Sequence, residues 1–257
     1  MPDQHAEERT AHLLDLISRQ QFASIDDMQR ATGASAPTIR RDLAALEKRG
    51  LVRRVRGGAS LTTSSSTLDE AFELRRKRNA REKGAIALAA SKLIDPPASL
   101  LLNDGSTTLA LAEELVSQAK PLWVATSALN LGERLASVSA IEVVVIGGAL
   151  RASSFGTSGP LATAALSQIT VDTTFLGCDG IDLELGPRYN SLLDAEVAAA
   201  MARQGRRVVV LADGNKVGQR SRAGSIDWSD VDVLVTNQVG PEWQERLRAA
   251  DVEVIQV

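Results

Sequence analysis

Polar residues suited to anion binding follow five apolar runs between residues 98 and 216. Hydroxyls and backbone N–H groups at a helix start bind phosphate, whereas carboxylates accept hydrogen bonds from sugar hydroxyls. Because the carboxyl ends of parallel strands share one edge of a sheet, where ligands bind, we expect these side chains to form one site. The candidates are Asp104, Gly105, Ser106, Thr107, Thr108, Thr126, Ser127, Gly148, Arg151, Gly177, Asp179, Gly180 and Lys216.

Several of these residues also have a purely structural interpretation. The stretch Asp104–Thr108 is compatible with ordinary helix capping, and Gly148 with a tight turn. Arg151 is compatible with a surface ion pair, and Lys216 with a solvated side chain. All five strand ends nevertheless agree in their chemistry, and this agreement favours a site for a small polyhydroxylated anion.

A second group of candidates precedes these in the chain. Ser24 and Ser35 each begin a predicted helix, and a tight turn at Gly33 separates the two helices. In a helix-turn-helix arrangement, the N-terminal part of the second helix enters the major groove of DNA. The candidates for base or phosphate contact on this helix are Ser35, Ala36, Thr38, Arg40 and Arg41.

Residues 51–61 predict a β-hairpin that turns at Gly57-Gly58. Its candidates for contact with phosphates or a minor groove are Arg53, Arg54 and Arg56. An isolated pair of arginines is more often a solvated face. Here the capped helix pair and the basic hairpin agree, and together they favour a winged helix-turn-helix.

The formal net charge of −3 conceals a division along the chain. Residues 1–60 hold 10 Lys and Arg against 8 Asp and Glu, and residues 61–83 hold 6 against 4. Residues 84–257 hold 13 against 20, a net charge of −7. A basic head on an acidic body indicates a dedicated polyanion-binding module.

From residue 98 onward, apolar strand-like runs alternate with helical stretches. Continuous Val, Ile and Leu runs such as residues 141–146 are typical of parallel strands buried on both faces. The alternation predicts an α/β fold with right-handed crossovers. Before this body, residues 60–67 predict a Ser/Thr-rich linker, and the basic stretch that follows predicts a solvated connector helix.

The composition argues against several classes of protein. Cys178 is the single cysteine, which excludes an internal disulfide and a cysteine-based zinc cluster. We expect no metal site and no cofactor. No run of about 20 apolar residues is present, and the N-terminal residues lack the apolar centre of a signal peptide. The expectation is therefore a cytoplasmic protein that has no membrane partner.

The chain resembles the DeoR family of bacterial transcriptional regulators over nearly its whole length. The segments that carry this resemblance are Pro37–Leu43, Arg56–Ala59, Asp104–Thr108, Gly147-Gly148 and Asp213…Lys216. Two departures from the family pattern are Arg56, where His is usual, and Ser127, where Asn is common. The resemblance implies a winged helix-turn-helix domain over residues 1–61, a linker and connector helix over 62–83, and an α/β effector-binding and oligomerisation domain over 84–257.

The resemblance also implies a function. The effector domain would be similar in fold to sugar-phosphate isomerases, and Glu196 would join the effector site. The protein would repress carbohydrate metabolism genes by binding double-stranded operator DNA. A phosphorylated sugar would change its affinity for the operator. The expected assembly is a homo-oligomer, either a dimer or a tetramer.

Two other functions remain open at this point. One is a sugar-phosphate isomerase or deaminase with a DNA-binding arm, because Asp179, Asp182, Asp213 and Lys216 resemble the acid/base residues of such isomerases. That alternative leaves the basic head unexplained. The other is an architectural DNA-binding protein whose acidic body only oligomerises and binds no small molecule.

Overall fold

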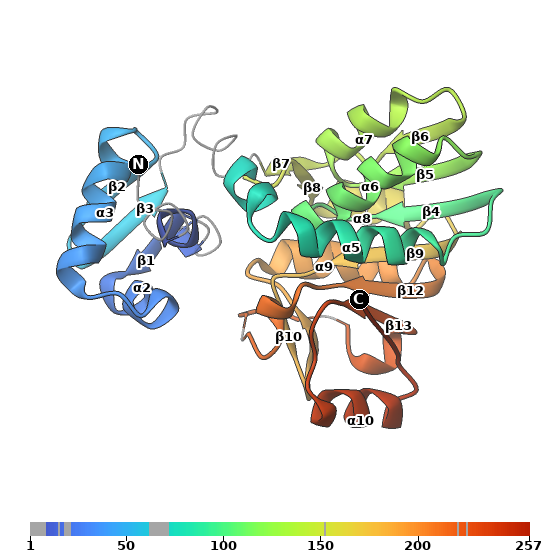
Figure 1. The fold of residues 1–257 in the computed structure, drawn as a ribbon. Coiled ribbons are helices and arrows are strands. Elements are labelled where there is room, and N and C mark those ends of the chain that lie inside the picture. The colour runs from blue at the N-terminus through green and yellow to red at the C-terminus, as the bar shows by residue number, and fades with distance from the viewer. Residues whose placement is uncertain are drawn as a thin grey trace. The chain divides into compact units, whose positions relative to one another are not determined.

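In the computed structural model, the chain forms two compact units, Met1–Arg78 and Asn79–Val257 (Figure 1). The structure describes residues 9–14, 16–17, 22–61, 72–151, 153–219, 221–224 and 226–257. The boundary between the units falls inside the predicted connector. The predicted linker lies mostly outside the described residues.

The first unit is a winged helix-turn-helix, as the sequence predicts. Residues 9–14 and 16–17 are helical, and they are followed by α2 (Ile25–Thr32) and α3 (Ala36–Lys48). A three-stranded antiparallel sheet has the order β1-β3-β2. Its strands are β1 (Phe22–Ser24), β2 (Val52–Val55) and β3 (Gly58–Leu61). The core consists of side chains from all three helical segments, among them Leu13, Leu14, Ile17, Met28, Ile39, Leu43 and Leu46.

The predicted helix boundaries are confirmed by their caps. The Ser24 side chain accepts from the Asp27 N–H, and the Asp27 carboxylate accepts from the Ser24 N–H, which completes a capping box. Gly33 ends α2 in the left-handed conformation, with φ of 69°. Ser35 caps α3 by accepting from the Thr38 N–H.

The predicted position of the wing turn is wrong by one residue. Val55 pairs with Gly58, so the turn consists of Arg56 and Gly57, and Gly57 has φ of 86°. Gly58 belongs to β3 instead. A Cβ at this residue would lie 2.1 Å from the backbone oxygen of Ala23 in β1, a strand that the sequence analysis did not predict. Gly58 is therefore required by the close approach of the two strands.

The predicted connector helix is interrupted. Residues 72–77 are helical, residues 78 and 79 form a turn, and α5 (Ala80–Ser91) begins after it. Asn79 adopts the left-handed conformation, with φ of 53° and ψ of 38°, which breaks the helical path. Asn is one of the few residues other than Gly that adopt this conformation readily.

The second unit contains a seven-stranded parallel sheet with the order β14-β13-β12-β9-β4-β5-β6. The strands are β4 (Ala98–Leu102), β5 (Leu122–Thr126), β6 (Ile141–Val145), β9 (Val171–Gly177), β12 (Gly205–Leu211), β13 (Val233–Thr236) and β14 (Glu253–Gln256). Each of them matches an apolar run of the sequence. The predicted α/β class is confirmed.

Helices cover both faces of this sheet (Figure 1). One face carries α5, α6 (Ser106–Gln118) and α7 (Leu129–Ala136), which pack on one another in that order. The other face carries α8 (Pro160–Leu166), α9 (Leu192–Ala202) and α10 (Pro241–Ala249), whose buried residues share one hydrophobic core. The helices change face where the direction of winding reverses, as right-handed crossovers require.

Short elements lie at the carboxyl edge of the sheet. Two antiparallel hairpins are formed by β7 (Ala149–Arg151) with β8 (Gly156–Ser158), and by β10 (Gly180–Asp182) with β11 (Gly186–Arg188). The single-turn helix η1 (Gly214–Lys216) follows β12 at this edge, whereas η2 (Trp228–Asp230) directly precedes β13. The hairpins were not predicted, because three-residue strands give too little alternation to detect.

The winding of the sheet reverses between β4 and β9, and one side chain bridges the two strands there. Asn103 Nδ2 donates to the Gly177 carbonyl, and Asn103 Oδ1 accepts from the Gly177 N–H, each at 2.8 Å. Asn103 is buried. Because both hydrogen bonds are buried, this residue fixes the spacing of the two strand ends at the topological switch point, where open α/β sheets bind ligands.

In the part of the chain that the structure describes, no helix is long and apolar enough to cross a membrane.

Replacing Asn103 by Ala should destabilise the second unit by about 2–4 kcal/mol, because the buried N–H and C=O of Gly177 would lose their partners. Urea unfolding followed by tryptophan fluorescence measures this. Trp123, Trp228 and Trp243 all belong to the second unit, so the signal reports that unit alone. Asn215→Ala, at an exposed position, is the matched control and should change stability by no more than about 0.5 kcal/mol. Equal effects of the two variants would contradict the bridging role.

Candidate functional site

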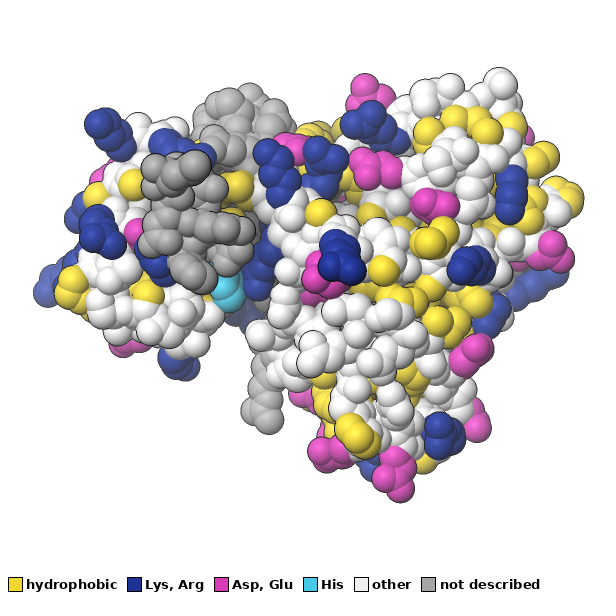
Figure 2. Space-filling model, viewed as in Figure 1, with side chains coloured by type: hydrophobic (Ala, Val, Ile, Leu, Met, Phe, Trp, Pro, Cys, Tyr) yellow, Lys and Arg dark blue, Asp and Glu magenta, His cyan; other side chains and the backbone are white. Residues whose placement is uncertain are grey.

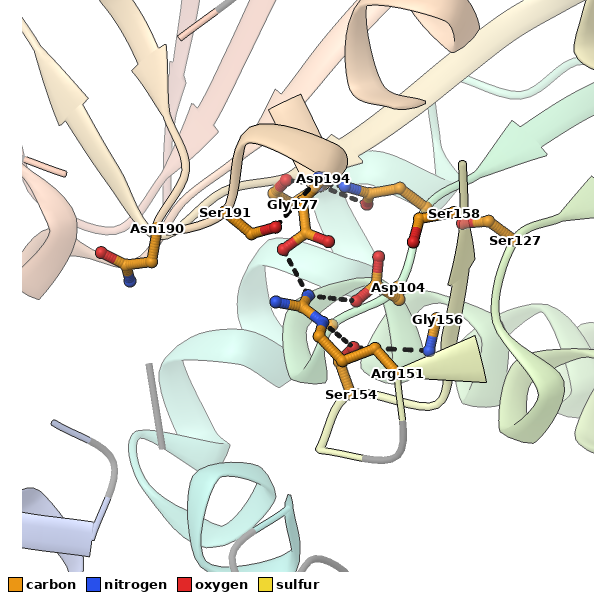
Figure 3. A network of polar contacts seen from close by, with 12 residues as sticks. Asp104, Ser127, Arg151, Ser154, Gly156, Ser158, Gly177, Asn190, Ser191 and Asp194 are labelled. Atoms are coloured by element: carbon orange, nitrogen blue, oxygen red, sulfur yellow. Dashed lines mark hydrogen bonds and ion pairs between the residues drawn. The ribbon is translucent and has the colours of Figure 1, made fainter. Parts of the chain in front are cut away.

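The centre of the site is Arg151, at the end of β7, which lies between two carboxylates (Figure 3). Its Nη2 lies 3.3 Å from Asp104 Oδ2, at the carboxyl end of β4, and also contacts Asp194 Oδ2, in the first turn of α9. Its Nε donates to Ser154 Oγ at 3.0 Å. Three segments far apart in the sequence thus meet at one guanidinium.

The carboxylates outnumber the positive charge at this point. Burial raises the pKa of Asp194 to about 7, and the carboxylates of Asp104 and Asp179 raise it too, while Arg151 opposes them. Burial lowers the pKa of Arg151, but its carboxylate neighbours raise it, and the net direction is upward. The carboxylates of Asp104, Asp179 and Asp194, called here the Asp104–Asp179–Asp194 cluster, thus surround a guanidinium that stays protonated.

Two buried hydroxyls lie near this cluster without a hydrogen-bond partner among the described residues. They are Ser127 Oγ and Tyr189 OH. Burial raises the pKa of Tyr189 well above its usual value, and the nearby carboxylates of Asp179, Asp104 and Asp194 add to this shift. A buried hydroxyl without a partner has an unmet hydrogen-bonding capacity, which a ligand can satisfy.

A second, cationic cluster lies at the start of α6. Lys216 Nζ is 3.4 Å from Thr107 Oγ1 and 4.0 Å from Asp213 Oδ2. Burial raises the pKa of Asp213, but Lys216, Lys83 and a hydrogen bond from Asn79 lower it more, so the net shift is downward. Within the described chain, no side chain caps the N-terminus of α6, whose N-cap is Gly105. The first N–H groups of this helix therefore suit an anion.

The structure brings only part of the predicted site together. Asp104, Arg151 and Asp179 belong to the acidic end, and Thr107 and Lys216 to the cationic end, with Gly105, Ser106 and Thr108 at the start of α6. Ser127 follows β5, and its N–H donates to the Leu102 carbonyl at the end of β4. Thr126 Oγ1 donates to the Leu102 carbonyl, so this hydroxyl joins two strands.

Three predicted glycines serve close packing. Gly177 is bound by Asn103, and a Cβ on Gly148 or Gly180 would lie 2.6 Å or 2.3 Å from a backbone oxygen. Glu196 is exposed on α9, whereas Asp194, two residues earlier, points to Arg151 (Figure 3).

Sequence reasoning missed three residues of the candidate site and a fourth residue, Asn79, that contacts it from outside. Asp194 could have been found, because Ser191 followed by an acid three residues later marks a helix start, and the Ser191 side chain indeed accepts from the Asp194 N–H. Lys83 is buried, although the connector was expected to be solvated. Tyr189 was not predicted, and Asn79 was noted only as part of the connector, because the contacts of both residues are with partners distant in sequence. Among the described residues, no group of His, Cys, Asp and Glu could hold a metal ion.

The predicted basic residues of the first unit are exposed, and Figure 2 shows Lys and Arg side chains over the surface of this unit. Arg40 and Arg41 are exposed on α3, and Arg53, Arg54 and Arg56 are exposed on the wing. Arg54 also contacts Glu47 Oε2 at 3.8 Å, and both side chains are nearly half exposed. Asp42, next to Arg41, is buried and accepts from Arg9 Nε at 2.6 Å, so it holds α3 against the first helical segment.

Comparison with known proteins agrees with this two-part organisation. Residues 9–65 match the model of the DeoR-like helix-turn-helix domain, and residues 78–238 match that of the DeoR C-terminal sensor domain. The chain belongs to the DeoR family of transcriptional regulators. It is thus a DNA-binding regulator, and the acidic body is its sensor domain, as the sequence analysis predicts.

The relatives align along nearly the whole chain. A transcriptional repressor AccR of Agrobacterium fabrum is 31% identical over 90% of this chain and 89% of its own length. An HTH-type transcriptional regulator GolR of Listeria innocua is 30% identical over 96% of this chain and 97% of its own length. Among solved structures, ribose 5-phosphate isomerase A of Neisseria gonorrhoeae matches with a TM-score of 0.39 and 20% identity, over 55% of this chain and 54% of that one.

The raised pKa of Asp194 predicts a pH-dependent stability. A carboxyl group with a pKa of about 7 in the folded state and about 3.8 when unfolded holds its proton more tightly when folded. Stability from this group is therefore present below about pH 4 and is lost as the pH rises to about 7, by roughly 2–4 kcal/mol. Asp194→Asn should remove this slope in urea unfolding followed by tryptophan fluorescence. Parallel pH profiles for the variant and the wild type would contradict the assignment.

The arginines of the first unit should differ in their effects on operator binding. Arg40→Ala or Arg41→Ala should weaken binding by about 1–3 kcal/mol if the lost contact is to a base edge, and should relax specificity at that base. Arg53→Ala should weaken all sequences alike and reduce the salt dependence, because a phosphate contact carries no sequence information. Fluorescence anisotropy at several salt concentrations separates the two effects. Wild-type affinity in all three variants would rule out this placement on DNA.

Proposed function

We propose that this protein is a transcriptional repressor whose affinity for operator DNA is changed by a phosphorylated sugar in the sensor domain. The observation that carries the proposal is the pairing of two clusters of opposite charge at one edge of the sheet. A cationic helix start and an acidic, hydroxyl-rich cluster suit the two ends of a sugar phosphate. A relative named as a transcriptional repressor supports the direction of control.

The phosphate would bind at the start of α6. The sensor domain is acidic overall, so attraction by net charge cannot hold a phosphate there. Local donors are required instead, and they are the N–H groups of Ser106, Thr107 and Thr108 together with the Lys216 ammonium. Lys83 adds a second buried positive charge on the side of Asp213.

The sugar hydroxyls would bind at the acidic cluster. Asp104 lies in the β4–α6 connection and Thr107 follows three residues later, in the first turn of α6, so the two ends of the site are close neighbours. Carboxylates accept hydrogen bonds from hydroxyls, and the Tyr189 hydroxyl can donate or accept one. Arg151 orients Asp104 and Asp194 for this task.

We further propose that the site senses its ligand and does not convert it. The Asp179 carboxylate accepts from the Asn190 N–H at 2.9 Å, and Asp194 contacts a guanidinium. Both carboxylates are thus engaged in holding the site together, whereas proton transfer between adjacent carbons needs a carboxylate that faces them. The relatives named as transcriptional regulators point the same way.

The working form would be a cytoplasmic homo-oligomer, a dimer or a tetramer. A two-fold symmetric assembly presents two winged helices to two half-sites of an operator, which a single head cannot do. The effector would act by binding two states of this assembly with different affinities, since a ligand that binds both states equally shifts nothing.

Thermal unfolding with ribose 5-phosphate, glucose 6-phosphate, fructose 6-phosphate and fructose 1-phosphate tests the proposal. A ligand at 100 times its Kd should stabilise the second unit by about 2.7 kcal/mol, and the unphosphorylated sugar should not. Lys216→Ala should weaken binding roughly tenfold to hundredfold, because a hydrogen bond to a charged group is lost. The matched control is Lys92→Ala, at an exposed position after α5.

The same ligands are then added to the operator complex. The expected result is a ligand-dependent change in operator affinity that Lys216→Ala diminishes. If no phosphorylated sugar in an extended panel changes either the unfolding or the operator affinity, the sensor role is wrong. If product accumulates from the bound sugar and Asp179→Asn abolishes it, the protein is an enzyme.

A further inference from the structure

Two consecutive residues at the boundary between the units each make a polar contact within their own unit. Arg78 is the last residue of the first unit, and its Nη2 lies 3.4 Å from His12 Nε2 in the first helical segment. Asn79 is the first residue of the second unit, and its Nδ2 donates to Asp213 Oδ1 at 3.1 Å. One peptide bond thus joins a residue held by the DNA-binding unit to a residue held by the sensor.

The backbone of Asn79 occupies a conformation that most residues avoid. Its φ and ψ are 53° and 38°, in the left-handed region, and its carbonyl accepts from the Lys83 N–H at 2.9 Å to begin α5. Because left-handed backbone is unfavourable for a residue with a Cβ, surrounding contacts must hold it in place. The hydrogen bond to Asp213 is a contact of this kind, made across 134 positions of sequence.

Asp213 connects this contact to the cationic end of the site. It is buried, 4% exposed, and it is the acid that faces both Lys216 and Lys83. Lys216 lies between Asp213 and the start of α6, because its Nζ is also near Thr107 Oγ1. A phosphate at that helix start would compete with Asp213 for the lysine, and it would add a second negative charge beside a buried carboxylate.

We propose that Asn79 and Asp213 are positioning residues that transmit anion binding at the start of α6 to the backbone between the two units. This inference rests on the proposed function. When the phosphate attracts the Lys216 ammonium, the Asp213 carboxylate loses part of the positive charge that balances it. The strength of the hydrogen bond from the Asn79 amide to Asp213 then changes. The balance between the left-handed conformation of Asn79 and other backbone conformations then changes, at the residue that joins the two units. Coupling of this kind is reciprocal, so operator DNA would change the affinity for the sugar phosphate by the same factor.

Asn79→Gly is the variant that tests this step. Glycine adopts the left-handed conformation freely, so the turn can still form, while the amide contact to Asp213 is removed. The matched control is Ala119→Gly at the end of α6, where φ is 49° and ψ is 38°. It places glycine in nearly the same conformation, and alanine has no polar side chain to lose.

The experiment measures operator affinity by fluorescence anisotropy, with and without whichever of the four phosphorylated sugars above binds most tightly. Isothermal titration of the same sugar gives its Kd for each variant. For Asn79→Gly we expect a Kd within about threefold of wild type and a sugar-dependent change in operator affinity that is at least about fivefold smaller, set against the usual range of coupling factors of roughly 5 to 150. Ala119→Gly should behave as wild type in both measurements.

Three results would overturn the inference. The first is a full wild-type response in Asn79→Gly. The second is an equal loss in Ala119→Gly, which would assign the effect to glycine flexibility. The third is a loss of sugar binding itself in Asn79→Gly, which would place Asn79 in the binding site. A wild-type protein that binds sugar phosphates but shows no operator response would instead contradict the proposed function, and the coupling with it.

Discussion

The reversal of winding between β4 and β9 is the constraint on which the second unit depends. The helices that connect the strands on the two sides of this point pack on opposite faces of the sheet. The strand ends at this point are therefore not covered by a crossing helix. Asn103 holds the two ends together with paired hydrogen bonds to Gly177. The residues that follow, Asp104 on one strand and Asp179 on the other, are thereby brought to one location. The topology leaves this edge open and one amide fixes its width, and together they position the candidate site.

Charged side chains of both signs gather at this edge of the sheet. The acidic cluster contains three carboxylates around Arg151, and the start of α6 lies beside it with Lys216 and Lys83. Asp213 lies on the lysine side and partly neutralises those cations before any ligand arrives. In the proposed function, a ligand with a phosphate at one end and hydroxyls at the other meets both needs at once, although the net charge of the domain is negative.

The sequence predicted the elements well and the contacts poorly, for one physical reason. Helix caps such as Ser24 with Asp27 are local, and apolar runs such as those of β9 and β12 report burial directly. Strand ends could therefore be assigned, and with them the positions of Asp104, Arg151, Asp179 and Lys216, whose binding role stays a prediction. Tyr189, Lys83 and Asn79 acquire their roles from partners distant in sequence. Glu196, added by resemblance, is exposed, whereas Asp194 occupies the place beside Arg151.

Neighbouring residues of α3 differ in what they contact. Arg40 and Arg41 are exposed, whereas Asp42 is buried against Arg9 and belongs to the fold. A change at the exposed arginines would therefore alter what α3 presents to DNA and leave the core of the domain intact. A change at Asp42 would instead remove the ion pair that holds α3 against the first helical segment. One side-chain contact thus separates the stability of this domain from the surface that it offers to an operator.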